Sequence, residues 1–68
     1  MTWELFEVWA VDEDDYEQLV DTTRSLKEAR ELAKKQLTDN AVEVIIYREV
    51  NEELEEFERL TKNNSTNS

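Results

Sequence analysis

The amino-acid sequence predicts a small α+β domain, with a three-stranded antiparallel sheet and one amphipathic helix on one face of it. Residues 41–50 (AVEVIIYREV) contain the longest run of β-branched and aromatic apolar residues, which indicates a buried strand. Residues 25–37 carry a capping signal followed by apolar residues at helical spacing. With 68 residues the chain forms one domain, which we assign to residues 1–62, followed by a polar tail at 63–68 that we expect to be disordered.

The first predicted strand covers residues 3–11 (WELFEVWAV) and lies in the middle of the sheet. Its alternate residues are apolar on both faces, with Phe6, Val8 and Ala10 on one side and Leu5, Trp9 and Val11 on the other. A strand that is paired on both sides and covered on one would have this pattern.

The next segment, Asp12–Asp15 (DEDD), is predicted to turn the chain. The sequence has no Gly and no Pro, so its turns depend on residues such as Asp, which tolerates the left-handed backbone conformation. Residues 16–22 (YEQLVDT) are shorter and more polar, and we predict that they return as an edge strand.

A helix is predicted to begin at Leu26, because Ser25 and Glu28 match the S-x-x-E capping box. Its apolar stripe consists of Leu26, Ala29, Ala33 and Leu37. The lysines and arginines of the segment lie off this stripe, so the outer surface should be basic. We expect the helix to end near Thr38, with Asn40 in the left-handed position that terminates it.

In the strand at 41–50, one face holds Val42, Val44, Ile46 and Val50, and we expect it to be core. The other face holds Glu43, Ile45, Tyr47 and Glu49 and should be mostly open. A helix that crosses one face of the sheet places this strand beside the first one, which gives a β-β-α-β domain with strand order 2-1-3 and antiparallel neighbours throughout.

The segment 51–62 (NEELEEFERLTK) has two interpretations. Leu54, Phe57 and Leu60 follow helical spacing, and Asn51 is a suitable N-cap, so we predict a short C-terminal helix. The alternative is a fourth strand after a turn at residues 51–52, which would make a ββαββ domain.

The net charge is −10, from 18 acidic and 8 basic residues, and it is unevenly distributed. Residues 1–23 hold eight acids and no base, residues 24–38 hold five bases and two acids, and residues 39–68 hold eight acids and three bases. This charge disfavours direct binding to nucleic acid or to anionic membranes. The N-terminus shows neither a signal peptide nor a membrane span, so we expect a cytoplasmic protein.

The sequence contains no motif for catalysis, a cofactor or a metal. It has no His and no Cys, which removes the common general base, the thiolate nucleophile and the usual zinc ligands. The DEDD segment fails the EF-hand pattern, because Tyr16, Glu17 and Thr23 occupy the third ligand, glycine and closing glutamate positions. We therefore expect no enzyme, no cofactor and no metal site.

The remaining candidate is a protein-binding surface. Trp9 and Tyr47 should lie on the open face among acidic residues, and aromatic side chains within a polar rim are typical of interface anchors. The residues predicted to bind a partner are Glu7, Trp9, Asp12, Glu13, Asp14, Asp15, Glu43, Tyr47 and Glu49. The partner should be a protein with a basic surface.

In length and composition, but not in any motif, the chain is similar to the small acidic inhibitors that phages and mobile elements encode against host nucleases and defence systems. That similarity suggests an inhibitor or nucleic-acid mimic that occupies a basic groove on a host protein. The alternative is a self-associating accessory module, such as a homodimer formed through the open face of the sheet. Ordinary solubility would also account for the acidic charge without any partner.

Overall fold

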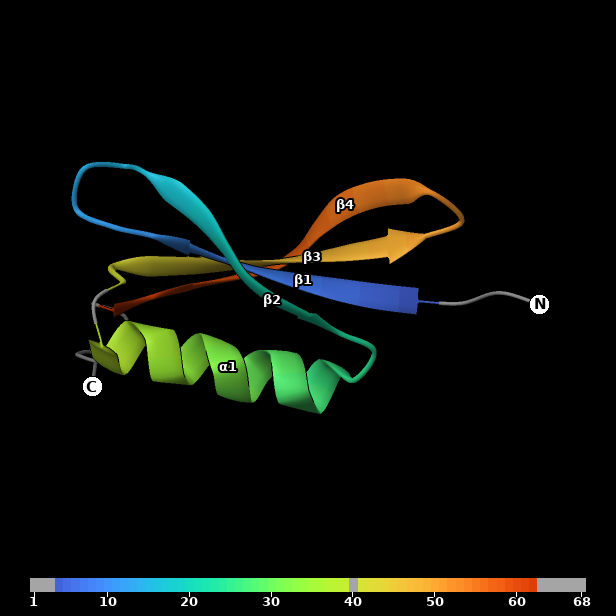
Figure 1. Ribbon diagram of the computed structural model, residues 1–68, viewed down its shortest axis with the longest axis horizontal. Helices are drawn as coiled ribbons and strands as arrows, with labels where there is room; N and C mark the ends of the chain where they lie inside the picture. The colour runs from blue at the N-terminus through green and yellow to red at the C-terminus, as the bar shows by residue number, and fades with distance from the viewer. Residues whose placement is uncertain (1–3, 40, 63–68) are drawn as a thin grey trace.

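The computed structural model describes residues 4–39 and 41–62 (Figure 1). Along the chain it contains β1 (Glu4–Val11), β2 (Glu17–Thr23), α1 (Leu26–Asp39), β3 (Glu43–Val50) and β4 (Glu53–Thr61). The strands form one antiparallel sheet in the order β2-β1-β3-β4. The α+β class, the central position of β1 and the order 2-1-3 are confirmed, and β4 extends the sheet beyond β3.

The predicted C-terminal helix over 51–62 is wrong, and the alternative ββαββ arrangement is correct. Asn51 and Glu52 have φ angles of 54° and 70°, so both residues of the β3–β4 turn are left-handed. A two-residue turn with this backbone matches the right-handed twist of a tight hairpin. Asn51 therefore reverses the chain instead of capping a helix.

A β-bulge explains why β4 shows helical spacing in its sequence. Ile46 pairs with Glu58 and Tyr47 pairs with Glu56, so Phe57 is an extra residue on β4. The Phe57 ring packs edge-on against Phe6 at 5.7 Å, on the face that carries α1. Leu54 lies on the opposite face, and the two side chains therefore do not form the single stripe that a helix would need.

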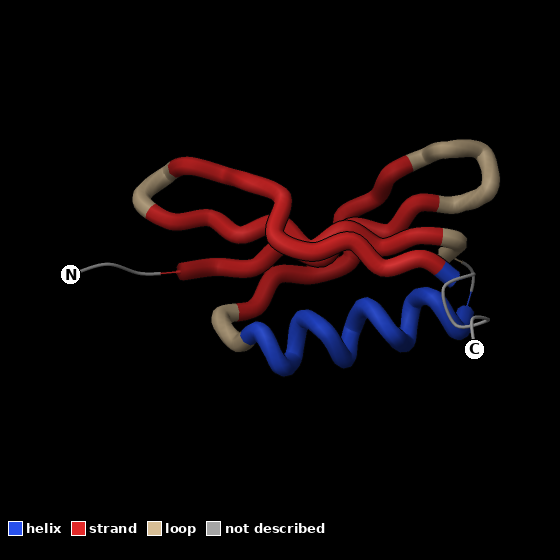
Figure 2. The backbone as a smooth tube through the Cα atoms, turned by 180° about the vertical axis from the view of Figure 1, so that it is seen from behind, coloured by secondary structure: helices blue, strands red, loops and turns tan. Residues whose placement is uncertain are grey.

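A second bulge lies in β2, where Val8 pairs with Asp21 and Trp9 pairs with Leu19, leaving Val20 as the extra residue. Bulges bend a strand and increase its local twist. Both outer strands accordingly curl, and Figure 2 shows the two hairpin tips rising on the side of the sheet away from α1.

The main core lies between α1 and the face of the sheet that α1 covers. Ala29 and Ala33 are fully buried, and their small side chains let the helix approach the strands closely. The strands contribute Phe6, Val8, Val44 and Ile46 to the same cluster. Leu26 and Leu37 pack at its margin, so the predicted helical stripe is confirmed.

The start of α1 at Leu26 is confirmed, although its cap differs from a simple capping box. The Ser25 hydroxyl accepts a hydrogen bond from the Glu28 amide at 3.3 Å. The Glu28 carboxylate does not reach back to the Ser25 amide. Instead, the Thr23 hydroxyl donates to the Glu28 carboxylate at 2.8 Å and accepts from the Ser25 amide at 3.1 Å. Thr23 therefore connects the Glu28 carboxylate to the Ser25 amide that a capping box would join directly.

The expectation that the second face of the β3 strand is mostly open is wrong at one residue. Ile45 is only 2% exposed, although α1 lies on the other side of the sheet. Its ladder neighbours are Trp9 on β1 and Arg59 on β4, and these large side chains flank it. Val11 on β1 is also buried, so this face has a small packed centre of its own.

Three predictions fall on residues outside the described ranges: the start of the first strand at Trp3, the helix terminator at Asn40 and the tail at 63–68. Within residues 4–39 and 41–62, no helix is long and apolar enough to cross a bilayer.

Candidate protein-binding face

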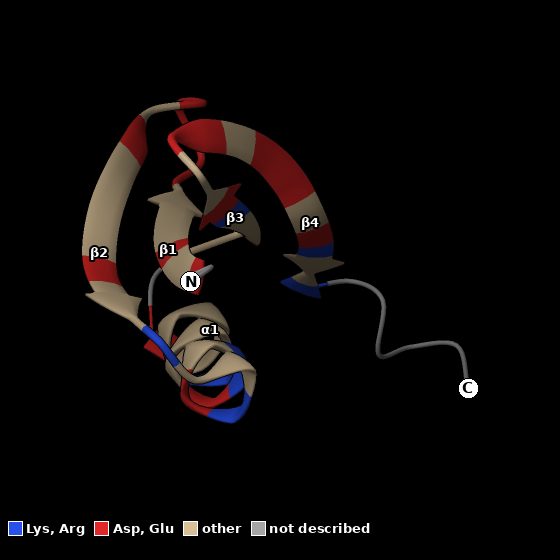
Figure 3. Cartoon of the chain, turned by 90° about the vertical axis from the view of Figure 1, so that its right-hand side faces the viewer, with Lys and Arg blue, Asp and Glu red and all other residues tan. Residues whose placement is uncertain are grey.

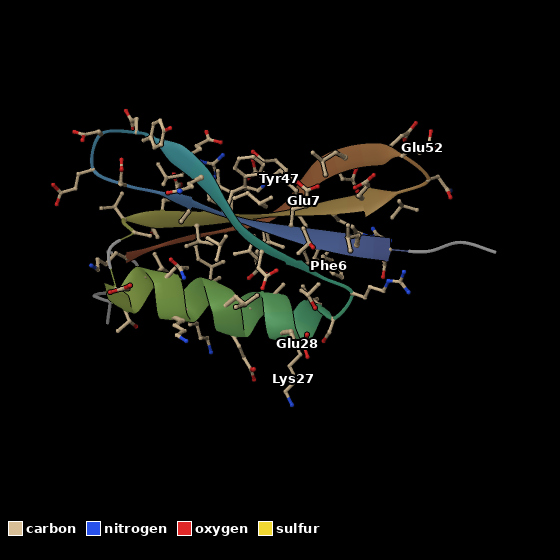
Figure 4. All side chains as sticks on the ribbon, viewed as in Figure 1. Phe6, Glu7, Lys27, Glu28, Tyr47 and Glu52 are labelled. Carbon is tan, nitrogen blue, oxygen red and sulfur yellow. The ribbon has the colours of Figure 1, made fainter. Side chains whose placement is uncertain are left out.

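The side of the sheet opposite α1 is called here the open face (Figure 4). Strand registers place these residues on it: Leu5, Glu7, Trp9 and Val11 of β1, Glu17 and Leu19 of β2, Glu43, Ile45, Tyr47 and Glu49 of β3, and Leu54, Glu56 and Arg59 of β4. In the described part of the chain no helix packs against this face.

Two aromatic residues occupy the middle of the open face. The rings of Trp9 and Tyr47 have centroids 6.4 Å apart and planes at 88°, which is an edge-to-face arrangement. The Trp9 indole N–H donates to the Glu7 carboxylate at 3.0 Å. Both rings are half-buried, so each packs on the sheet and still reaches the surface.

Exposed leucines extend this apolar centre toward both edges of the sheet. Leu19, directly opposite Trp9 on β2, is 46% exposed. Leu54, directly opposite Glu49 on β4, is 52% exposed. Together with the aromatic pair they place an apolar side chain on each of the four strands of this face, and these four residues are called here the apolar band. Exposed apolar side chains gathered on one face are typical of protein contacts.

Arg59 neutralises two of the carboxylates on this face. It contacts Glu43 at 2.9 Å and Glu56 at 3.0 Å, with two hydrogen bonds to the latter. The hydrogen bonds from Arg59 hold the pKa of Glu56 below its ordinary value, and the same contacts raise the pKa of Arg59. Arg59 and Glu56 are exposed and Glu43 is half-buried, so the pairs orient side chains more than they stabilise the fold.

Three further carboxylates on the open face form no ion pair within the described chain: Glu7, Glu17 and Glu49. Glu7 and Glu49 are half-buried beside Tyr47. The open face is therefore an apolar band with uncompensated negative charge next to its aromatic centre.

The structure brings together five of the nine predicted site residues on this face: Glu7, Trp9, Glu43, Tyr47 and Glu49. The other four form the β1–β2 loop at one end of it. Leu19, Leu54, Glu56 and Arg59 also belong to the face but were not predicted. The face of the sheet on which these side chains lie depends on the two bulges, and strict alternation along a strand does not reveal the bulges.

In the β1–β2 loop, Asp12 has a structural task. Its carboxylate accepts the backbone amides of Asp14 at 2.9 Å and Tyr16 at 3.1 Å, which closes the turn. Asp15 has a φ of 65°, the left-handed conformation that the sequence predicts for one of these aspartates. Glu13 and Asp14 remain exposed with carboxylates that the turn does not use.

The helix side of the molecule carries more positive charge than the open face. Lys27, Arg30, Lys34 and Lys35 are exposed on α1, together with three acidic residues of the helix, while acidic residues follow β4 and the hairpin tips (Figure 3). Arg30 also forms an ion pair with Glu58 of β4 at 3.0 Å. The two faces of the domain thus differ in both charge and apolar surface.

Four hollows in the described surface have neither Trp9 nor Tyr47 in their lining. One of about 370 Å³ lies between β2 and α1, and its charged lining residues, such as Asp21, Glu31 and Lys35, are all exposed. No polar or charged residue in the described ranges is buried. Residues 4–39 and 41–62 also hold no group of three or more acidic side chains arranged to bind a metal ion.

Comparisons of the chain with protein-family models, with curated proteins and with solved structures find no match.

Proposed function

We propose that the chain is a non-enzymatic protein-binding module and that the open face is its contact surface. The observation that carries this proposal is the apolar band around Trp9 and Tyr47, which is partly exposed and next to carboxylates that form no ion pair within the described chain. Large aromatic side chains in the middle of a contact surface are the usual anchors of binding energy. The partner should present basic side chains around an apolar patch.

A catalytic role has less support. A carboxylate acts as a general acid near neutral pH when burial or a neighbouring charge raises its pKa. In the described chain no ionisable residue is buried, and the carboxylates beside Tyr47 lie on a broad surface.

The most specific form of the proposal is an inhibitor that occupies a basic groove on a protein that binds nucleic acid. The β1–β2 loop and the β3–β4 turn lie at opposite ends of the molecule (Figure 1), so their acidic residues would then meet cations at both ends of the open face. Attraction between oppositely charged surfaces accelerates their encounter, and added salt weakens this attraction.

Self-association through the open face is the alternative, and the charge pattern disfavours it. A symmetric dimer would bring the unpaired Glu7 and Glu49 of both copies into one interface. Like charges in a desolvated contact oppose binding, and the described part of this face offers Arg59 alone as a cation, already held by two glutamates.

Two measurements test the proposal. Sedimentation should give a monomer. Affinity capture from cells that carry the gene should then recover a partner with the wild-type chain but not with a Leu19→Ser, Leu54→Ser variant. Both leucines are exposed, so the substitutions should leave the fold intact.

The matched control is a Lys27→Ser, Lys34→Ser variant, which changes the same number of exposed side chains on α1. It should retain the partner. A stable dimer that protects Trp9 from solvent would favour self-association, and a partner lost from the α1 variant alone would assign binding to the basic surface.

A further inference from the structure

We infer that the corner formed by Trp9, Tyr47, Glu7 and Glu49 is a receptor site for an arginine side chain of the partner. This inference rests on the proposed function, because it names the chemical group that would anchor the partner to the open face. It is carried by the edge-to-face geometry of the two rings and by the position of two carboxylates that form no ion pair with any described residue.

The first element of the site is the edge-to-face pair. Trp9 is opposite Ile45 in the ladder and Tyr47 is opposite Glu7, so the two rings are diagonal neighbours on one face. With planes at 88°, one ring presents its edge to the other and keeps its own faces clear of that neighbour. The face of an aromatic ring is electron-rich and attracts a cation placed above it.

The second element is the pair of carboxylates around Tyr47. Glu7 lies directly across the ladder from Tyr47, and Glu49 lies two residues further along β3 on the same face. The indole N–H of Trp9 fixes one oxygen of Glu7 at 3.0 Å, so this carboxylate is already oriented. A preorganised acceptor loses less freedom when it binds a ligand.

The third element is that these carboxylates have no cation within the described chain. Arg59 is held by Glu43 and Glu56, Arg30 by Glu58, and Arg48 by Glu4 and Glu55. Glu7 and Glu49 are nevertheless half-buried, which removes part of their hydration. A cation from another molecule would supply the missing charge.

The geometry favours arginine over lysine. A guanidinium group is planar, so it can stack on an aromatic ring and donate to a carboxylate in the same plane, with donors left for a second carboxylate. An ammonium group is more strongly hydrated and lacks this planar fork. The site offers both a ring and two acceptors, which is the combination that a guanidinium satisfies.

The test uses a small probe and does not require the natural partner. N-acetyl-arginine amide would be titrated into ¹⁵N-labelled protein carrying Trp3→Phe, so that Trp9 provides the one indole N–H signal. N-acetyl-citrulline amide, which has nearly the same shape without the charge, is the control probe. We expect a saturable shift of the Trp9 indole and of the Tyr47 ring with the arginine probe and no saturable shift with citrulline.

Matched variants separate the site from general attraction to an acidic protein. Glu7→Gln with Glu49→Gln should weaken arginine binding by about fivefold or more, as expected for loss of two half-buried charge contacts. Glu31→Gln with Glu53→Gln removes the same charge from exposed positions outside the open face and should change binding by less than about twofold.

Equal shifts with citrulline, or equal weakening by the two double variants, would overturn the inference. Failure of this site is distinguishable from failure of the proposed function. A partner that contacts the open face while the arginine probe shows no saturable binding leaves the proposed function in place. A protein that binds the probe while its partner contacts α1 contradicts the proposed function, and with it the assignment of the site to the partner, although the site still binds a guanidinium group.

Discussion

Shortening one buried isoleucine on each face of β3 by a methylene group tests whether the open face is packed. Ile46 is fully buried beneath α1, and Ile45 is 2% exposed on the opposite side, between Trp9 and Arg59. Shortening a buried isoleucine to valine costs roughly 0.5–1.5 kcal/mol in the free energy of unfolding. The structure therefore predicts that Ile45→Val and Ile46→Val each cost about 1 kcal/mol.

Valine is preferable to alanine here because the domain is small. A chain of this length has a free energy of unfolding of roughly 3–10 kcal/mol. Alanine at a buried isoleucine costs roughly 2–5 kcal/mol and could unfold the domain outright. A loss of about 1 kcal/mol keeps the variant folded and lowers Tm by roughly 4–8 °C.

Urea unfolding followed by far-ultraviolet circular dichroism measures the effect. The control is Leu54→Val, the same deletion at a 52% exposed strand position, which should change the free energy of unfolding by less than about 0.5 kcal/mol. If Ile45→Val behaves like Leu54→Val while Ile46→Val loses about 1 kcal/mol, the packing of Ile45 between Trp9 and Arg59 is refuted.

Three further predictions concern the cap, the turn and the Arg59 ion pairs. Ser25→Ala should cost about 1 kcal/mol because it removes the acceptor of the Glu28 amide, and an unchanged urea midpoint would show that the helix does not depend on this cap. Glu52→Gly should stabilise the domain by roughly 0.5–1 kcal/mol by removing a non-glycine residue from a left-handed turn, and a lower midpoint would argue against that backbone. Arg59 lowers the pKa of Glu56, so this carboxylate stabilises the fold at neutral pH and loses that contribution as pH falls through the lowered pKa. Because the pair is exposed, Glu56→Gln should lower the urea midpoint only slightly at about pH 7 and reduce its further decrease in acid, and a higher midpoint at neutral pH would contradict a stabilising pair.

Local signals in the sequence were sufficient for most of the fold. The helix follows from Ser25, Glu28 and the apolar stripe, all within a few turns of chain. The pairing of β1, β2 and β3 follows from short connections and from the helix that crosses one face. The helix and the β1–β2 hairpin depend on contacts between residues that are close in the sequence, so local signals predict them. The β1–β3 pairing joins distant residues such as Trp9 and Ile45, and it follows from the direction in which the helix returns the chain.

The error at β4 has a physical cause. Leu54, Phe57 and Leu60 match a helical period because the bulge at Phe57 adds one residue to a strand whose side chains otherwise alternate. The bulge is compatible with the Phe57–Phe6 contact, which joins residues 51 positions apart in the sequence. A short segment with good caps offers no local sign of such a contact.

The candidate site was predictable only in part. Its residues on β1 and β3 follow from alternation along each strand, whereas those on β2 and β4 do not. Alternation within β1 and β3 places Glu7, Trp9, Tyr47 and Glu49 on one face without knowledge of the other strands. The contribution of the outer strands was not predictable, because it depends on which residue each bulge inserts. The ion pairs of Arg59 were not predicted, because a helix over residues 51–62 does not pair Arg59 with β3.

The most direct test of the open face as the binding surface is methyl cross-saturation in the complex. The labelled chain would be bound to its captured, unlabelled partner, and the partner's protons would be saturated. We predict that signal loss is strongest at the methyl groups of Leu19 and Leu54 on the open face and weak at Leu32 and Leu37 of α1. Signal loss confined to the leucines of α1, with Leu19 and Leu54 unaffected, would contradict the proposal.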